Sequence, residues 1–192
     1  MHRRFIALLA VAAAALLIAA PGASAGQAKA KASWGWYYGA TTLEVDPGTL
    51  GALTSLGVAP GAVAPAQLSG ATYSFPITNS LRSALRTGVV RHRGGISLTA
   101  GSTTVRLTDF DIRLLEGKLY GRVNGAGPVA LLDLDYSGLG IRFQGGRINI
   151  GPVGTTLTQG AADALNTAFG VSALSDDTVV GEATIRYRLF PF

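Results

Sequence analysis

The chain has 192 residues, no cysteine, and 16 basic against 11 acidic side chains, for a net charge of +5. The lack of cysteine excludes disulfides, thiol catalysis, cysteine–zinc sites and iron–sulfur clusters, and with only His2 and His92 a site built from several histidines of the mature chain is excluded too. The basic residues are scattered rather than clustered, which argues against nucleic acid as a partner.

The N-terminus has the pattern of a secretory signal. Basic residues at positions 3 and 4 precede an apolar run over residues 5–20, and Ala23-Ser24-Ala25 supplies small residues for cleavage. We therefore expect a signal peptide at 1–25, a flexible tail at 26–33 and a single domain at 34–192, placed outside the cell or in its envelope. An uncleaved membrane anchor is the alternative. No later apolar run reaches the length of a membrane-spanning helix, which predicts no transmembrane segment after cleavage.

Beyond Trp34 the pattern is mainly one of short strands, with apolar and polar residues alternating and glycine-rich connections between them. The predicted strands lie at residues 71–77, 95–99, 103–114, 118–124, 129–136, 141–150 and 182–190. Many short strands without long helical periodicity predict an all-β fold, mainly an antiparallel sandwich or roll.

One predicted strand changes phase. Val105 and Leu107 share a face, but Phe110 and Ile112 continue the alternation shifted by one residue. Because side chains on a strand alternate with a period of two, this shift predicts a bulge or kink near Thr108-Asp109.

Two segments instead predict short capping helices, near 46–57 and 158–170. The first has Asp46 as a candidate N-cap and proline at the next position, and both segments end at a glycine. Each helix follows a Thr-Thr-Leu sequence and precedes a strand that opens Ala-Thr, so that 41–75 and 155–187 read as an internal pseudo-repeat. We expect each helix to close one end of the sandwich.

Two Asp-x-Asp pairs are the candidate catalytic carboxylates, Asp109 with Asp111 and Asp133 with Asp135. Residues i and i+2 of a strand share a face, so each pair can bind calcium or act as acid and base in hydrolysis. A solvated charged strand face explains the same pattern. No nucleophile elbow or phosphate-binding loop is present.

The central part of the chain resembles a known family. The segments "FPIT" (75–78), "RHRGGISLTAGSTTVRLTDFDI" (91–112) and "KLYGRVN" (118–124) are similar in order and pattern to the HtaA domain of actinobacterial secreted and surface proteins of haem uptake. They also resemble short HtaA-like secreted proteins of unassigned role.

The resemblance implies a mostly β fold and a haem site in which a tyrosine near the domain start binds iron and a histidine supports it. His92 matches that histidine, and Tyr37 and Tyr38, which follow Trp34-Gly35, are the matches for the tyrosine. The Ser-Phe-x-x-Tyr segment of the family is missing from this chain.

These observations leave three hypotheses. The first is an exported, non-catalytic β domain that acts as a structural or interaction module of the cell envelope. The alternative is a domain that binds haem or another small hydrophobic ligand, with His92, Tyr37 and Tyr38 as haem contacts. The third is an Asp-dependent hydrolase. The corresponding partners are envelope components or haem, with no metal site and no catalytic residue predicted, and the oligomeric state is left open.

Overall fold

The computed structural model of the chain describes residues 37–189. The predicted signal peptide (1–25) and tail (26–33) lie outside these residues. The helices are α1 (Pro47–Ser55), α2 (Leu81–Thr87) and α3 (Gln159–Phe169). The strands are β1 (Gly39–Val45), β2 (Ala59–Val63), β3 (Gln67–Ser69), β4 (Thr72–Ile77), β5 (Val89–Arg91), β6 (Gly95–Ala100), β7 (Thr103–Arg113), β8 (Lys118–Val123), β9 (Pro128–Asp135), β10 (Gly140–Gln144), β11 (Arg147–Leu157) and β12 (Val179–Arg188).

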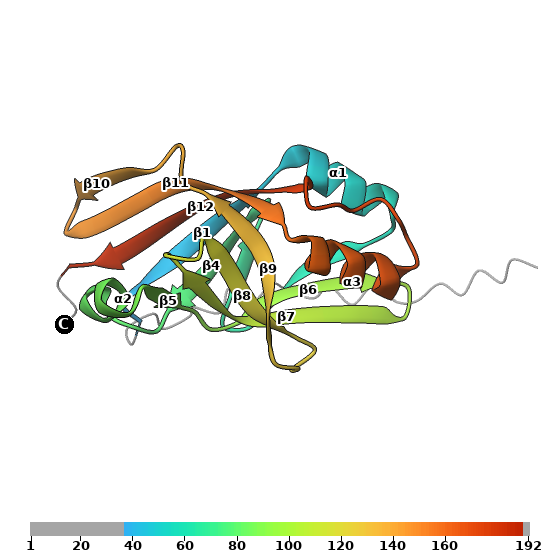
Figure 1. Cartoon of the computed structure of the whole chain (residues 1–192), viewed down its shortest axis with the longest axis horizontal. Helices are drawn as coiled ribbons and strands as arrows, with labels where there is room; N and C mark the ends of the chain where they lie inside the picture. Colours follow the sequence, from blue (N-terminus) through green and yellow to red (C-terminus); the bar gives the residue numbers. More distant parts are fainter. Residues whose placement is uncertain (1–36, 190–192) are drawn as a thin grey trace, which may run out of the picture. The chain divides into compact units, whose positions relative to one another are not determined.

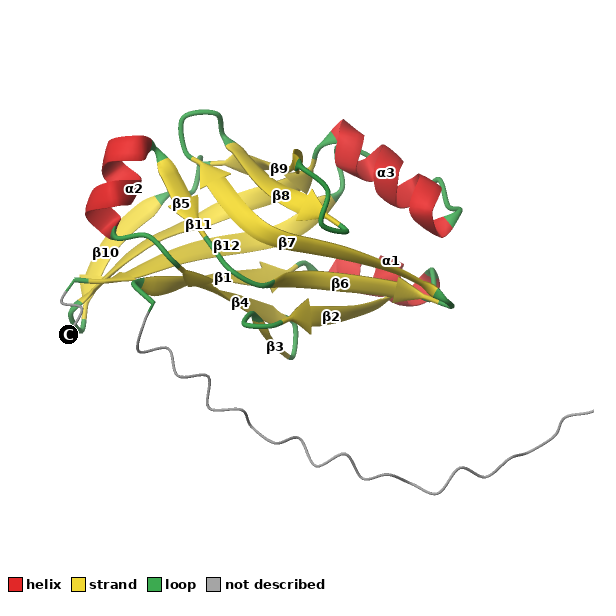
Figure 2. Cartoon of the chain, turned by 90° about the horizontal axis from the view of Figure 1, so that it is seen from below, coloured by secondary structure: helices red, strands yellow, loops and turns green. Residues whose placement is uncertain are grey.

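All strands belong to one antiparallel sheet, with the order β2-β6-β7-β8-β9-β11-β12-β1-β4-β3. The two ends of this path, β2 and β3, are consecutive in the chain and in contact, so the sheet curls into a nearly closed sandwich (Figures 1 and 2). This confirms the predicted all-β class. No helix among residues 37–189 is long and apolar enough to cross a membrane.

The seam of the curled sheet is the line along which its two ends, at β2 and β6 and at β3 and β4, come together. Contacts across this seam hold the curled sheet together. The hydroxyl of Tyr73 on β4 donates to the carbonyl of Gly61 on β2, 3.2 Å away. Further along β4, Ile77 forms an isolated antiparallel bridge with His92, and the N–H of Arg93 donates to the Pro76 carbonyl. Because these bonds join β4 to the segment that precedes β6, residues 91–93 serve as a strap across the seam.

Both predicted helices are present, and they lie at the same end of the domain (Figure 1). Asp46 accepts a hydrogen bond from the N–H of Thr49 at the start of α1, and Thr158 accepts one from Ala161 at the start of α3, as expected of N-caps. The structure adds α2, which the sequence analysis missed. This helix has seven residues, of which only Ala84 is buried, so it gives no apolar periodicity.

The pseudo-repeat appears as two units that meet where β12 pairs with β1. The second is β11-α3-β12, whereas the first, from β1 through α1 to β4, has β2 and β3 inserted between the helix and the last strand. Their registers differ, because Thr41 pairs with Phe75 whereas the corresponding Thr155 pairs with Gly181. The helices also lie at one end of the sandwich rather than at opposite ends, which corrects that expectation.

The predicted kink in β7 is confirmed. The β7–β8 register shifts between Thr108 and Asp111, and Asp109 between them has a φ of 54°. A residue with positive φ is typical of a bulge. The bulge turns Phe110 and Ile112 inward, where both are buried.

Thr158→Ala is expected to lower the free energy of unfolding by about 1–2 kcal/mol. The substitution removes the α3 cap, and it also removes the bond that the Thr158 hydroxyl donates to the Ala130 carbonyl at 2.8 Å. Urea unfolding measures the loss, and Thr158→Ser, which keeps the hydroxyl, should recover most of it. An equal loss in the serine variant would show that the cap contributes nothing.

Candidate functional site

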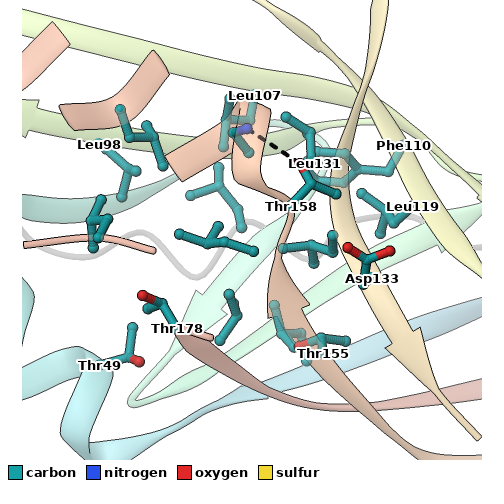
Figure 3. Close-up of a pocket in the computed structure, with 18 of the residues that line it drawn as sticks. Thr49, Leu98, Leu107, Phe110, Leu119, Leu131, Asp133, Thr155, Thr158 and Thr178 are labelled. Carbon is teal, nitrogen blue, oxygen red and sulfur yellow. Dashed lines mark hydrogen bonds between the residues drawn. The ribbon is translucent and has the colours of Figure 1, made fainter. Parts of the chain in front are cut away.

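A cavity of about 950 Å³ lies inside the curled sheet. Figure 3 shows Leu98, Leu107, Leu119 and Leu131 pointing into it from the four successive strands β6 to β9. The opposite wall comes from β1, β4, β11 and β12, so the cavity is the space that the sheet encloses. Its size is within the range of small-molecule sites, and its walls are mostly aliphatic, as in such sites.

Helices α1 and α3 cover one end of this cavity. Leu50 and Leu53 of α1 and Leu56 at its C-cap line the cavity while only half-buried, and α1 contains no fully buried residue. Ala164 and Ala168 of α3 line it and are also exposed, which places them where the cavity meets solvent. The two helices therefore border a mouth whose rim carries small and aliphatic side chains.

His92 is the predicted site residue that reaches the cavity wall. It is 5% exposed, and both of its ring nitrogens have partners. Nδ1 is 3.0 Å from the Phe110 carbonyl, and Nε2 is 2.7 Å from the Thr41 hydroxyl. A carbonyl only accepts, so Nδ1 carries the proton, and Nε2 of the neutral ring accepts from Thr41. With its backbone bonds to β4 and β7, His92 ties three strands together.

Burial lowers the pKa of His92 to about 4, and the hydrogen bond to Phe110 opposes this shift only in part. The imidazole is therefore neutral at physiological pH. Neutral imidazole is the form that binds metals, but the lone pair of Nε2 is already used by the Thr41 hydroxyl.

The two glycines after His92 are required by close packing. A Cβ on Gly94, whose φ is +80°, would lie 2.4 Å from the backbone nitrogen of Ala66. A Cβ on Gly95 would lie 1.9 Å from the Leu107 carbonyl oxygen. Real Cβ atoms do not approach so closely, so the His-x-Gly-Gly motif is explained by the fold at the seam as well as by any ligand.

Tyr37 and Tyr38 lie just before β1 and line neither of the two main cavities. Tyr38 is tied in by its backbone, which donates to Ile77 and accepts from Arg188, and its ring packs against the smaller of two core clusters. The structure thus brings His92 to the cavity and leaves the two tyrosines outside it. In this chain the hydroxyl that contacts His92 belongs to Thr41.

Two other tyrosines line the cavity, and both hydroxyls donate to carbonyls. Tyr73 bonds to Gly61, and burial raises its pKa to about 12. Tyr136 bonds to Leu114 at 3.2 Å, and burial raises its pKa as well. Iron binds the phenolate, so both rings are held in the form that binds it poorly.

The two predicted carboxylate pairs differ in their surroundings. Burial raises the pKa of Asp111, Arg91 and Arg113 oppose the shift, and the charge of Asp109 at the bulge adds to it. Asp133 lines the cavity and pairs with Lys118, whereas Asp135 accepts from the backbone and hydroxyl of Ser137. Within residues 37–189 no three metal-binding side chains come together.

Sequence reasoning missed a second cavity, of about 360 Å³, between α2 and the strands β11 and β12. Tyr187 lines it, 1% exposed, with a hydroxyl that has no hydrogen-bond partner among the described residues. Burial raises the pKa of this phenol strongly. The alternation of β12 predicts an inward tyrosine, but nothing in the sequence reveals that its hydroxyl lacks a partner.

No protein-family model matches the chain, and no curated protein matches it. Among solved structures it is similar to the C-terminal domain of HtaA from Corynebacterium glutamicum, with a TM-score of 0.55 and 11% identity over 79% of this chain and 96% of that one. Heme binding protein HtaB from the same organism gives a TM-score of 0.49 and 11% identity over 78% and 92%. The first likeness shows that this chain has the fold of the HtaA domain, as its sequence pattern predicts.

Proposed function

We propose that this HtaA-like domain is a non-catalytic, exported binding domain that holds haem, or another apolar molecule of similar size, in the cavity between the sheet and helices α1 and α3. The observation that carries the proposal is the cavity itself, with its volume of about 950 Å³ and its aliphatic walls. An enclosed apolar space with a few polar groups is the usual form of a small-molecule site. A structural module has no need of such a space, which costs packing energy.

The size and apolarity of this cavity fit haem, but its polar side chains do not offer a free ligand for the iron. The volume and the apolar walls suit a porphyrin ring, and the HtaA-like fold supports the haem binding, though not the tyrosine contacts, that the sequence resemblance implies. The side chains offer no ready iron ligand, because His92, Tyr73 and Tyr136 all use their ligating atoms in hydrogen bonds. The proposal therefore rests on the apolar space and assigns no iron bond.

Haemin titration of the chain from Gly26 onward tests the proposal, because every contact described here lies within residues 37–189 and is kept. We expect the Soret band to change with saturable binding, and iron-free protoporphyrin IX to compete because the ring is held by apolar contacts. Ala168→Trp should weaken binding about tenfold or more by filling the mouth. Thr167→Trp is the matched control, since this neighbouring residue is exposed and lies outside the cavity lining.

Further variants test whether the predicted haem contacts, His92, Tyr37 and Tyr38, bind the iron. Thr41→Val frees Nε2 of His92, and a change of the bound haem spectrum that Thr41→Val/His92→Ala loses would show that the freed imidazole reaches the iron. Tyr37→Phe and Tyr38→Phe test the tyrosines in the same way. If neither haemin nor an apolar fluorescent probe binds, or if Ala168→Trp binds as well as the wild type, the proposal is wrong.

A further inference from the structure

The β10–β11 hairpin extends beyond the main path of the sheet. Strand β11 has eleven residues and pairs with β9 only over its second half, while its first half pairs with β10. No described strand pairs with the other edge of β10. The hairpin lies at the end of the domain opposite α1 and α3 (Figure 1), and its tip is a Gly145-Gly146 turn with positive φ at both residues.

Large apolar side chains are exposed on this hairpin. Phe143 is 71% exposed and Ile141 58%, and both belong to β10. Leu139 precedes the strand and is also exposed, and Leu189 lies beside the turn because its N–H donates to the Gly146 carbonyl. Four exposed apolar residues in one small region form a patch of the kind that marks a binding surface.

Four arginines occupy the other face of the same strands. Arg142 lies in one row with Arg186, two strands away, and Arg147 is directly opposite Arg188. Their positions alternate with the inward Ile148, Ile185 and Tyr187, so all four lie on the outer face. Neighbouring strands are only about 4.8 Å apart, and like charges in direct opposition destabilise a sheet.

These charges have no compensation within the described part of the chain. No carboxylate of residues 37–189 lies within 4.0 Å of the four guanidinium groups. Both faces of the projecting hairpin are together named the hairpin surface. It comprises the exposed apolar residues Leu139, Ile141, Phe143 and Leu189, and the outer-face arginines Arg142, Arg147, Arg186 and Arg188. The positive charge of this surface favours an anionic partner, and its exposed Phe143 and Ile141 favour a partner that also has an apolar region.

We propose that the hairpin surface binds an anionic lipid bilayer, with the hairpin entering end-on so that Phe143 and Ile141 on one face reach the interface and the four arginines on the other face contact lipid phosphates. A bilayer supplies both chemistries at one surface. The cavity mouth at the opposite end stays open to solvent in this orientation. The proposal is independent of the cavity ligand.

Co-sedimentation with vesicles tests this proposal on the chain from Gly26 onward, which lacks the apolar signal segment. We expect binding to phosphatidylcholine vesicles that contain phosphatidylglycerol, little binding to phosphatidylcholine alone, and weakening by added salt. Each arginine near an anionic surface contributes about fivefold in affinity, so Arg147→Gln/Arg188→Gln should weaken binding by about twenty-fivefold. Phe143→Ser should weaken it as well.

Arg93→Gln/Arg106→Gln is the control, since it removes the same charge from two exposed arginines elsewhere and should leave most of the binding. Urea midpoints should not fall in any of these variants, because the substituted residues are exposed or half-exposed and Arg147→Gln/Arg188→Gln removes two opposed like charges. Equal binding to neutral and anionic vesicles, or an equal loss in the control, would overturn the proposal. The proposal would also be overturned if the wild-type chain does not bind vesicles and instead forms a dimer in solution that Phe143→Ser dissociates.

Discussion

His92→Ala is expected to lower the free energy of unfolding by about 3 kcal/mol. The variant loses both ring hydrogen bonds, leaves the buried Thr41 hydroxyl without a partner, and opens a gap in the wall of the cavity. An unpartnered buried hydroxyl alone costs about 1–3 kcal/mol. Because His92 ties β1, β4 and β7 together at the seam, urea unfolding at neutral pH should show a clearly lower midpoint with the same slope.

Two further variants separate the ring bonds from a general effect of substitution at the seam. Arg93→Ala changes an exposed neighbour and keeps the backbone bond to Pro76, so its effect should stay within about 0.5 kcal/mol. Thr41→Val/His92→Ala should cost less than the sum of the single variants by about 1 kcal/mol, because both singles break the same bond. Strict additivity would show that the Thr41–His92 bond does not contribute to stability.

The parts of the fold that the sequence predicts are those with a local signal. The alternation of β7 and its phase shift give both a strand and its bulge, and Asp46 and Thr158 give the starts of two helices. The missed helix α2 has a cap at Ser80 and an αL glycine at Gly88, which are its only local signals. Short strands such as β2, with Pro60 and Gly61 inside it, have compositions that look like loops.

The candidate site is less predictable because it is made by distant residues. His92 stands out as a histidine beside two glycines, but its partner Thr41 is 51 positions away and looks like any strand threonine. The cavity is enclosed by strands from nearly the whole domain, so it depends on how the sheet curls rather than on any motif. Tyr37 and Tyr38 are matched to the haem-binding tyrosine by resemblance, and their role in haem binding stays a prediction.

Acid is expected to destabilise the domain through His92. The pKa of this residue is about 4 in the folded state and 6.5 in the reference state, so the unfolded chain binds the proton more readily. The stabilisation is complete above pH 6.5, falls as the pH decreases, and is gone below about pH 4. Near the middle of this window the free energy of unfolding should fall by roughly 1.4 kcal/mol per pH unit, for a total of about 3 kcal/mol.

Urea unfolding at several pH values from about 7 to 4.5 measures this dependence, and His92→Gln is the matched variant because glutamine offers hydrogen bonds but does not titrate. Carboxylates begin to titrate only toward the lower end of this range, and they are the same in both proteins. Among them Asp111 acts in the opposite sense, since its pKa is raised in the folded state. The difference between the two curves therefore isolates His92. Parallel curves would mean that the ring becomes protonated within the folded domain, and that the Thr41–His92–Phe110 bonds open without cost.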